Sequence, residues 1–102
     1  MDSVTAGEAR SWTVFSSHGL VLLYLAGHPD STLRLVSDAL GFTERQISRI
    51  VKDLVSADMV EVARHGRRQT YTVRADAALR HPSVRHVTVG RILVAMRAGT
   101  GR

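Results

Sequence analysis

The chain has 102 residues, 44% of them hydrophobic, which suits one small domain with a core of its own. It contains no cysteine, so disulfides, thiolate metal sites and cysteine redox chemistry are excluded. Its net charge is +5, and all but Lys52 of its 14 basic residues are arginines. This charge favours a polyanionic partner without distinguishing DNA, RNA and anionic lipid.

The sequence shows no segment that would direct the chain to a membrane. Its longest apolar run lies between Gly19 and Gly27, far short of the roughly 20 residues that cross a bilayer. Residues 1–8 lack the basic segment and apolar core of a signal peptide. We therefore expect a cytoplasmic protein with no membrane partner.

Residues 1–11 are small and polar, and we expect them to form a flexible lead-in. The first predicted helix covers residues 16–28 and ends at Pro29. Residues 20–26 make this helix apolar on almost every side, so it must be covered on most of its surface. It is either the central helix of the core or a helix that a second subunit also covers.

A second, shorter helix is predicted over residues 33–40, and Gly41 stands where a left-handed residue would end it. Thr43 can cap the next helix, residues 43–57, and Gln46 occupies the reciprocal position of a capping box. The residues of the shorter helix expected to face the core are Leu33, Val36, Ala39 and Leu40.

The helix over residues 43–57 has two different faces. The spacing of a buried stripe is followed by Ile47, Ile50, Val51, Leu54 and Val55. The opposite face carries Glu44, Arg45, Ser48, Arg49 and Lys52. Such a face is rich in hydrogen-bonding groups that fit a DNA major groove, although a simple solvated face is the alternative.

A β-hairpin is predicted over residues 60–73, with residues 65–68 as its turn. Val60 and Val62, and then Thr70 and Thr72, alternate with more polar neighbours. The tip of the hairpin offers Arg64, His65, Arg67 and Arg68. A basic hairpin beside a polar helix face can follow the phosphates of a nucleic acid.

An irregular link ends at Pro82, and a last helix is predicted over residues 83–98. One of its sides carries Val89, Ile92, Leu93 and Met96, and another carries Val84, Val87 and Val94. Two apolar sides suit a terminal helix that packs both on its own domain and on a second copy of the chain.

This order of elements resembles the winged helix-turn-helix transcription regulators of bacteria, in the MarR-like and ArsR-like group. The likeness is carried by residues 33–54, by Ala57-Asp58-Met59-Val60 and by Gly66-Arg67-Arg68-Gln69-Thr70-Tyr71. It implies an α+β, mostly α, fold: one winged helix-turn-helix domain over residues 1–102, with N- and C-terminal dimerisation helices. It also implies a transcription regulator that binds double-stranded DNA, rather than an enzyme.

The resemblance implies that helix 43–57 enters the major groove and that hairpin 60–73, the wing, lies on the backbone or in the minor groove. The residues expected to contact DNA are Thr43, Glu44, Arg45, Gln46, Ser48, Arg49, Lys52, Arg64, His65, Arg67 and Arg68. Arg45 or Arg49 could donate two hydrogen bonds to guanine. Gln46 could read adenine or close the capping box, and Glu44 could accept from cytosine or favour the helix dipole.

The expected assembly is a homodimer that reads an imperfect palindrome. Its interface is expected to contain Trp12, Phe15, Leu22, Val89, Ile92, Leu93 and Met96. Repression is the expected mode, because a small chain needs only to occlude a promoter, while activation remains open.

Two alternatives belong to other classes of function. The domain could dock a partner protein instead of DNA, or an apolar effector could bind between the first and last helices, near Trp12, Phe15, Tyr24 and Met96. No cofactor or metal is expected, because the five histidines form no i, i+4 pair, and a zinc or nickel site shared between two copies is the less favoured alternative. No nucleophile–base pair or phosphate-binding loop indicates an enzyme.

Overall fold

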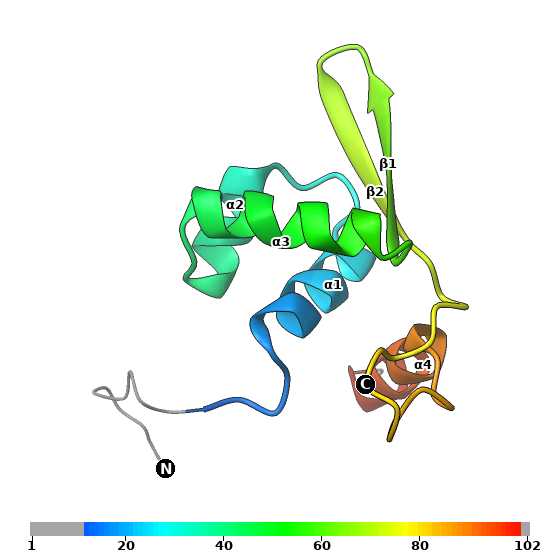
Figure 1. Ribbon diagram of the computed structural model, residues 1–102. Coiled ribbons are helices and arrows are strands. Elements are labelled where there is room, and N and C mark those ends of the chain that lie inside the picture. The colour runs from blue at the N-terminus through cyan, green and yellow to red at the C-terminus, as the bar shows by residue number, and fades with distance from the viewer. Residues whose placement is uncertain (1–11, 101–102) are drawn as a thin grey trace.

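The computed structural model describes the backbone of residues 12–100 and the side chains of residues 12–97. The predicted lead-in, residues 1–11, lies outside this part. The elements in chain order are α1 (Ser17–Gly27), α2 (Leu33–Leu40), α3 (Glu44–Ser56), β1 (Val60–His65), β2 (Arg68–Val73) and α4 (Val89–Thr100). Helices α1 to α3 form a body from which the wing, β1 and β2, projects, while α4 lies on the other side of the body (Figure 1). The predicted mostly helical α+β fold is confirmed.

Local side-chain signals set the ends of α2 and α3 as predicted. Thr32 caps α2 by accepting a hydrogen bond from the Leu35 N–H at 3.1 Å. Gly41 ends that helix in the left-handed conformation, with φ 78°, which a residue without a Cβ adopts readily. Thr43 and Gln46 form the predicted capping box at the start of α3.

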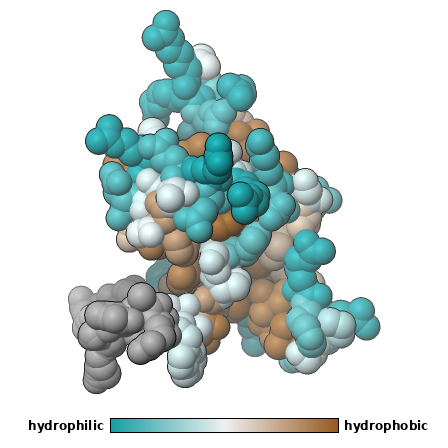
Figure 2. Space-filling model, turned by 60° about the vertical axis from the view of Figure 1, so that its left-hand side comes forward, coloured by the Kyte–Doolittle hydropathy of each residue, from teal (hydrophilic) through white to brown (hydrophobic). Residues whose placement is uncertain are grey.

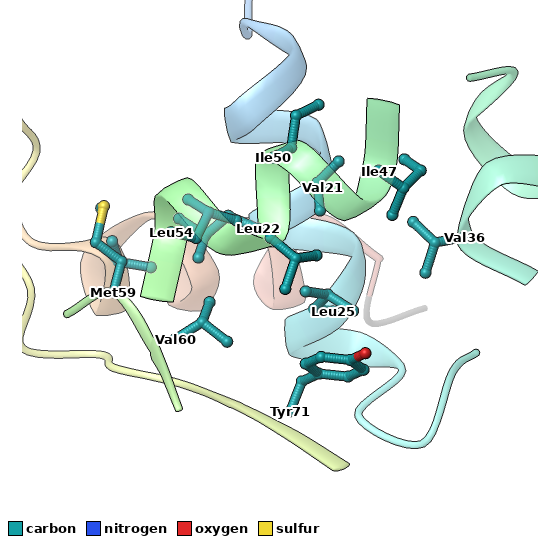
Figure 3. Close-up of a cluster of buried hydrophobic side chains, with 12 residues drawn as sticks. Val21, Leu22, Leu25, Val36, Ile47, Ile50, Leu54, Met59, Val60 and Tyr71 are labelled. Atoms are coloured by element: carbon teal, nitrogen blue, oxygen red, sulfur yellow. The ribbon is translucent and has the colours of Figure 1, made fainter. Parts of the chain in front are cut away.

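The core forms around α1. Side chains from α1, α3 and the wing point toward one another in Figure 3, with Val21 and Leu25 of α1 fully buried between Ile47 and Val60. Tyr71 of β2 closes the same cluster. Burial of this apolar surface is the main driving force for folding. It also fixes the rotation of α3 about its own axis, and hence which of its residues face outward.

Two residues predicted to face the core are exposed instead. Ala39 lies on the outer side of α2, because the buried stripe of that short helix runs through Val36 and Ser37. Val55 is 38% exposed, because it faces a groove beside the wing, whereas its neighbour Leu54 is the core residue of that turn.

The wing pairs in the antiparallel register Val60↔Val73 to His65↔Arg68. The turn contains only two residues, one of them Gly66 at φ 67°. This short turn places Tyr71, rather than a threonine, opposite Val62 on the inner face. The apolar alternation predicted at Thr70 and Thr72 is therefore wrong by one residue.

The start of the last helix is also corrected: α4 begins at Val89, and residues 83–88 form turns. The Val89 N–H donates to the Ala77 carbonyl at 2.9 Å, and the Leu79 N–H donates to the Val87 carbonyl at 3.0 Å. These bonds join residues 87–89 to the link, and the Val84 N–H donates to the His81 carbonyl in a turn, so Val84 and Val87 are not on the helix as predicted. In the described part of the chain, no helix is long and apolar enough to span a membrane.

Candidate nucleic-acid interface

The outer face of α3 carries three cations in a row: Arg45, Arg49 and Lys52. All three are exposed. Among the described residues, no carboxylate forms an ion pair with any of them. Arg45 and Arg49 are four residues apart, so they project from the same side of the helix. We call Arg45, Arg49 and Lys52 the cationic row.

The structure assigns a different task to two of the predicted contact residues. Thr43 Oγ1 accepts from the Gln46 N–H at 3.1 Å, and Gln46 Oε1 accepts from the Thr43 N–H at 2.9 Å. Of the two uses foreseen for Gln46, the structure contains the cap. Glu44 is exposed in the first turn of α3, where a negative charge is favourable to the helix dipole.

A groove of about 740 Å³ separates α3 from the wing. Ser48 and Lys52 of α3 and Arg64 of β1 line it, together with Val55 and Val62, which are 38% and 39% exposed. The groove is therefore apolar inside and bordered by two cations that the described residues leave without a carboxylate partner.

Tyr71 forms part of the lining of this groove. Its hydroxyl donates to Gln69 Oε1 at 3.1 Å. Burial raises the pKa of Tyr71 above its ordinary value, and the nearby Arg64 opposes that rise only in part. The phenol therefore stays neutral at physiological pH and contributes a hydrogen-bond donor rather than a charge.

The wing tip presents Arg64, His65, Arg67 and Arg68 to solvent. Arg68 lies 3.7 Å from Asp30 of the α1–α2 loop, whereas no ion pair involves the other two arginines within the described chain. The wing and the cationic row thus give one end of the molecule a concentration of positive charge, and hydrophilic residues cover that end in Figure 2.

Apolar surface gathers at the opposite end, where α1 begins and α4 lies (Figure 2). Of the residues predicted for a dimer interface, Trp12, Phe15 and Met96 are exposed, and Ile92 and Leu93 are half-buried. Leu22 and Val89 are only 5% and 1% exposed and belong to the core of the single chain. Val14 and Val94, which are not among the residues predicted for the interface, are exposed as well.

The residues expected to line an effector pocket do not come together. A groove of about 380 Å³ between α1 and α4 contains Met96, but not Trp12, Phe15 or Tyr24. The Tyr24 ring instead stacks on His28, with ring centroids 4.1 Å apart. Within the described residues, no group of three or more histidines or carboxylates could hold a metal ion.

One contact outside the predicted set joins α1 to α3: His18 Nε2 lies 2.8 Å from Asp53 Oδ2. No sequence pattern indicates this pair, because the two residues belong to different helices and meet only through packing. The contact attaches the start of α1 to the second half of α3, one turn beyond Arg49.

A helix, a glycine turn, a second helix with an outward cationic row and a basic hairpin together define a winged helix-turn-helix domain. A model of the MarR family matches residues 16–69, which is more than half of the chain. The chain belongs to the MarR family, whose members are DNA-binding transcription regulators rather than enzymes. The match gives no support to the ArsR-like part of the expected resemblance. No curated protein and no solved structure matches the chain.

Proposed function

We propose that this protein is a homodimeric repressor that reads an imperfect palindrome, with α3 in the major groove and the wing on the backbone or in the minor groove. The cationic row is the observation that carries the proposal. Its three side chains are exposed and without ion pairs in the described chain, on a helix whose opposite face is locked into the core.

Arg45 and Arg49 are assigned to the bases. A guanidinium can donate two parallel hydrogen bonds to guanine O6 and N7, and the N-terminal part of a recognition helix lies nearest the base edges. Ser48 and Lys52 lie further along the helix at the groove, which suits contacts to phosphates. Thr43 and Gln46 support the helix start, because their side chains are engaged with each other.

The wing tip is assigned to the sugar–phosphate backbone or a narrow minor groove. Arg64, His65 and Arg67 are exposed on a two-stranded ribbon that projects from the body (Figure 1). Arginines in such a position gain from the strong negative potential of a narrow minor groove. Their contribution depends on salt and little on sequence.

The dimer is assigned to the apolar end. Trp12 and Val94 are 84% and 61% exposed, and Phe15, just before α1, and Met96, on α4, are exposed as well. Large apolar groups gathered on one surface are typical of a protein–protein interface. An interface there leaves both recognition helices free to bind half-sites about one helical turn apart, roughly 34 Å. A dimer bound in this way can occlude a promoter.

The test has two parts. DNA sequences bound by the purified protein are selected from a random library, and binding of the selected duplex is then measured by fluorescence anisotropy against a random duplex at two salt concentrations. We expect tighter binding to the selected duplex, a steep salt dependence and two chains per site by sedimentation. Equal affinity for both duplexes would refute sequence-specific reading, and one chain per site would refute the dimer.

One observation favours a second candidate, docking of a protein partner. Val55 and Val62 are partly exposed in the groove between α3 and the wing, and a partner could bury them. Because Lys52 and Arg64 lie beside these valines, a DNA strand suits the groove better than an apolar segment of a protein. If no duplex binds at low salt, docking of a protein partner becomes the favoured function of the groove.

A further inference from the structure

A carboxylate lies beside the wing, among the cations that the proposed function assigns to DNA. Asp30 belongs to the loop between α1 and α2, and its Oδ1 is 3.7 Å from Arg68 Nη2. Both side chains are largely exposed, so neither is required by the core. Within the described chain, Arg68 is the wing-tip arginine that has a carboxylate partner.

Backbone hydrogen bonds, rather than the ion pair, hold Asp30 in this position. Pro29 and Asp30 are the central residues of a turn in which the Ser31 N–H donates to the His28 carbonyl at 3.1 Å. Ser31 is buried, which secures the turn to the body. The Pro29 carbonyl also accepts from the Tyr71 N–H of β2 at 2.9 Å. The loop is thus joined to the wing, and Asp30 remains beside it whether or not Arg68 is engaged.

We propose that Asp30 acts as an electrostatic brake that lowers the affinity of the wing for any DNA duplex. The inference rests on the proposed binding of the wing to DNA. Asp30 engages Arg68 and so withholds one cation from phosphates, which lowers the sequence-independent part of the affinity. The base contacts assigned to α3 are not affected. Because phosphate contacts are common to every duplex, the brake lowers the affinity for selected and random duplexes alike.

The same contact contributes little to folding. Exposed ion pairs stabilise proteins by about 0–1 kcal/mol, because solvent screens them and ordering two side chains costs entropy. Asp30→Asn keeps the size of the side chain and the turn geometry, since asparagine is also common in turns. The variant therefore changes the charge beside Arg68 while preserving the fold, which a thermal melt verifies.

The experiment measures anisotropy of a random duplex of roughly 20 base pairs, two helical turns, over a series of salt concentrations. Asp30→Asn is expected to bind roughly three to five times more tightly than wild type, with a salt slope steeper by about one phosphate contact. The matched control is Asp76→Asn. It also removes an exposed carboxylate beside an arginine, Arg74 at 3.6 Å, but Arg74 keeps Glu61 at 3.1 Å. The control is expected to bind within about twofold of wild type.

A double-mutant cycle tests whether the effect passes through Arg68. In the Arg68→Ala background, adding Asp30→Asn is expected to change the affinity by less than about twofold. The brake is overturned if Asp30→Asn gives no gain, if Asp76→Asn gives an equal gain, or if the gain persists without Arg68. Failure of wild type to bind any duplex would refute the proposed function and the brake together, whereas wild-type binding with no gain refutes the brake alone.

Discussion

Replacement of Arg49 by alanine separates base reading from general attraction to DNA. Arg49 lies at the middle of the cationic row, is exposed and has no ion pair in the described chain. Alanine is also the best helix former, so the variant loses no packing and little helix stability. Any loss of affinity is therefore a loss of contact with DNA.

The expected loss follows from the geometry of one guanidinium on guanine. A bidentate pair contributes about 1–3 kcal/mol of discrimination, so Arg49→Ala is expected to weaken binding to the selected duplex by roughly 5- to 150-fold. A random duplex does not present a guanine at the required position, so the loss there should be small. Arg91→Ala is the matched control, because Arg91 is an equally charged, exposed residue on α4, away from the cationic row. Equal losses on selected and random duplexes would refute base reading by Arg49.

Three further outcomes test other parts of the molecule. Arg67→Ala should weaken binding to all duplexes alike and reduce the salt slope by about one; an unchanged slope would exclude a phosphate contact. Gly90→Ala should lower the free energy of unfolding by about 1–3 kcal/mol, because a Cβ there would lie 2.9 Å from the Ala75 carbonyl oxygen. Gly27→Ala, with open space around its Cβ, should not destabilise in the same denaturant titration. Since burial raises the pKa of Tyr71, the fold should lose stability as pH rises above about 10, and Tyr71→Phe should flatten that loss in pH-dependent melting.

Elements whose signals are local could be predicted from the sequence. The ends of α2 and α3 are set by Thr32, Gly41 and Thr43, each within four residues of its hydrogen-bond partner. The two-residue turn at Gly66 likewise fixed the position of the wing. The start of α4 could not be predicted in this way, because the hydrogen bonds of Val87 and Val89 lead back to Leu79 and Ala77, far earlier in the chain.

In the candidate site, the sequence predicted which residues of α3 face outward, but not which side chains contact one another. Periodicity placed Arg45, Arg49 and Lys52 on the outside of α3, and the structure exposes them there. Periodicity could not show that Gln46 is engaged in the cap. A glutamine at this position could either cap the helix or read a base, and the sequence is the same in both cases. Nor could it show Asp30 beside Arg68, since that contact depends on how the α1–α2 loop meets the wing.

Helix α3 and the wing differ in how firmly the rest of the chain holds them. This difference supports the proposal that α3 reads bases and that the wing contacts phosphates. Helix α3 is fixed at its start by the Thr43 capping box, along its length by buried Ile47 and Leu54, and in its second half by Asp53 on His18. Base reading needs such fixed geometry, because a bidentate hydrogen bond tolerates little displacement.

The wing is joined to the body near Tyr71, and its exposed tip extends beyond that point (Figure 1). Phosphate contacts tolerate displacement, because Coulomb attraction falls slowly with distance. We therefore expect base discrimination to depend on α3, and salt-dependent affinity to depend on the wing.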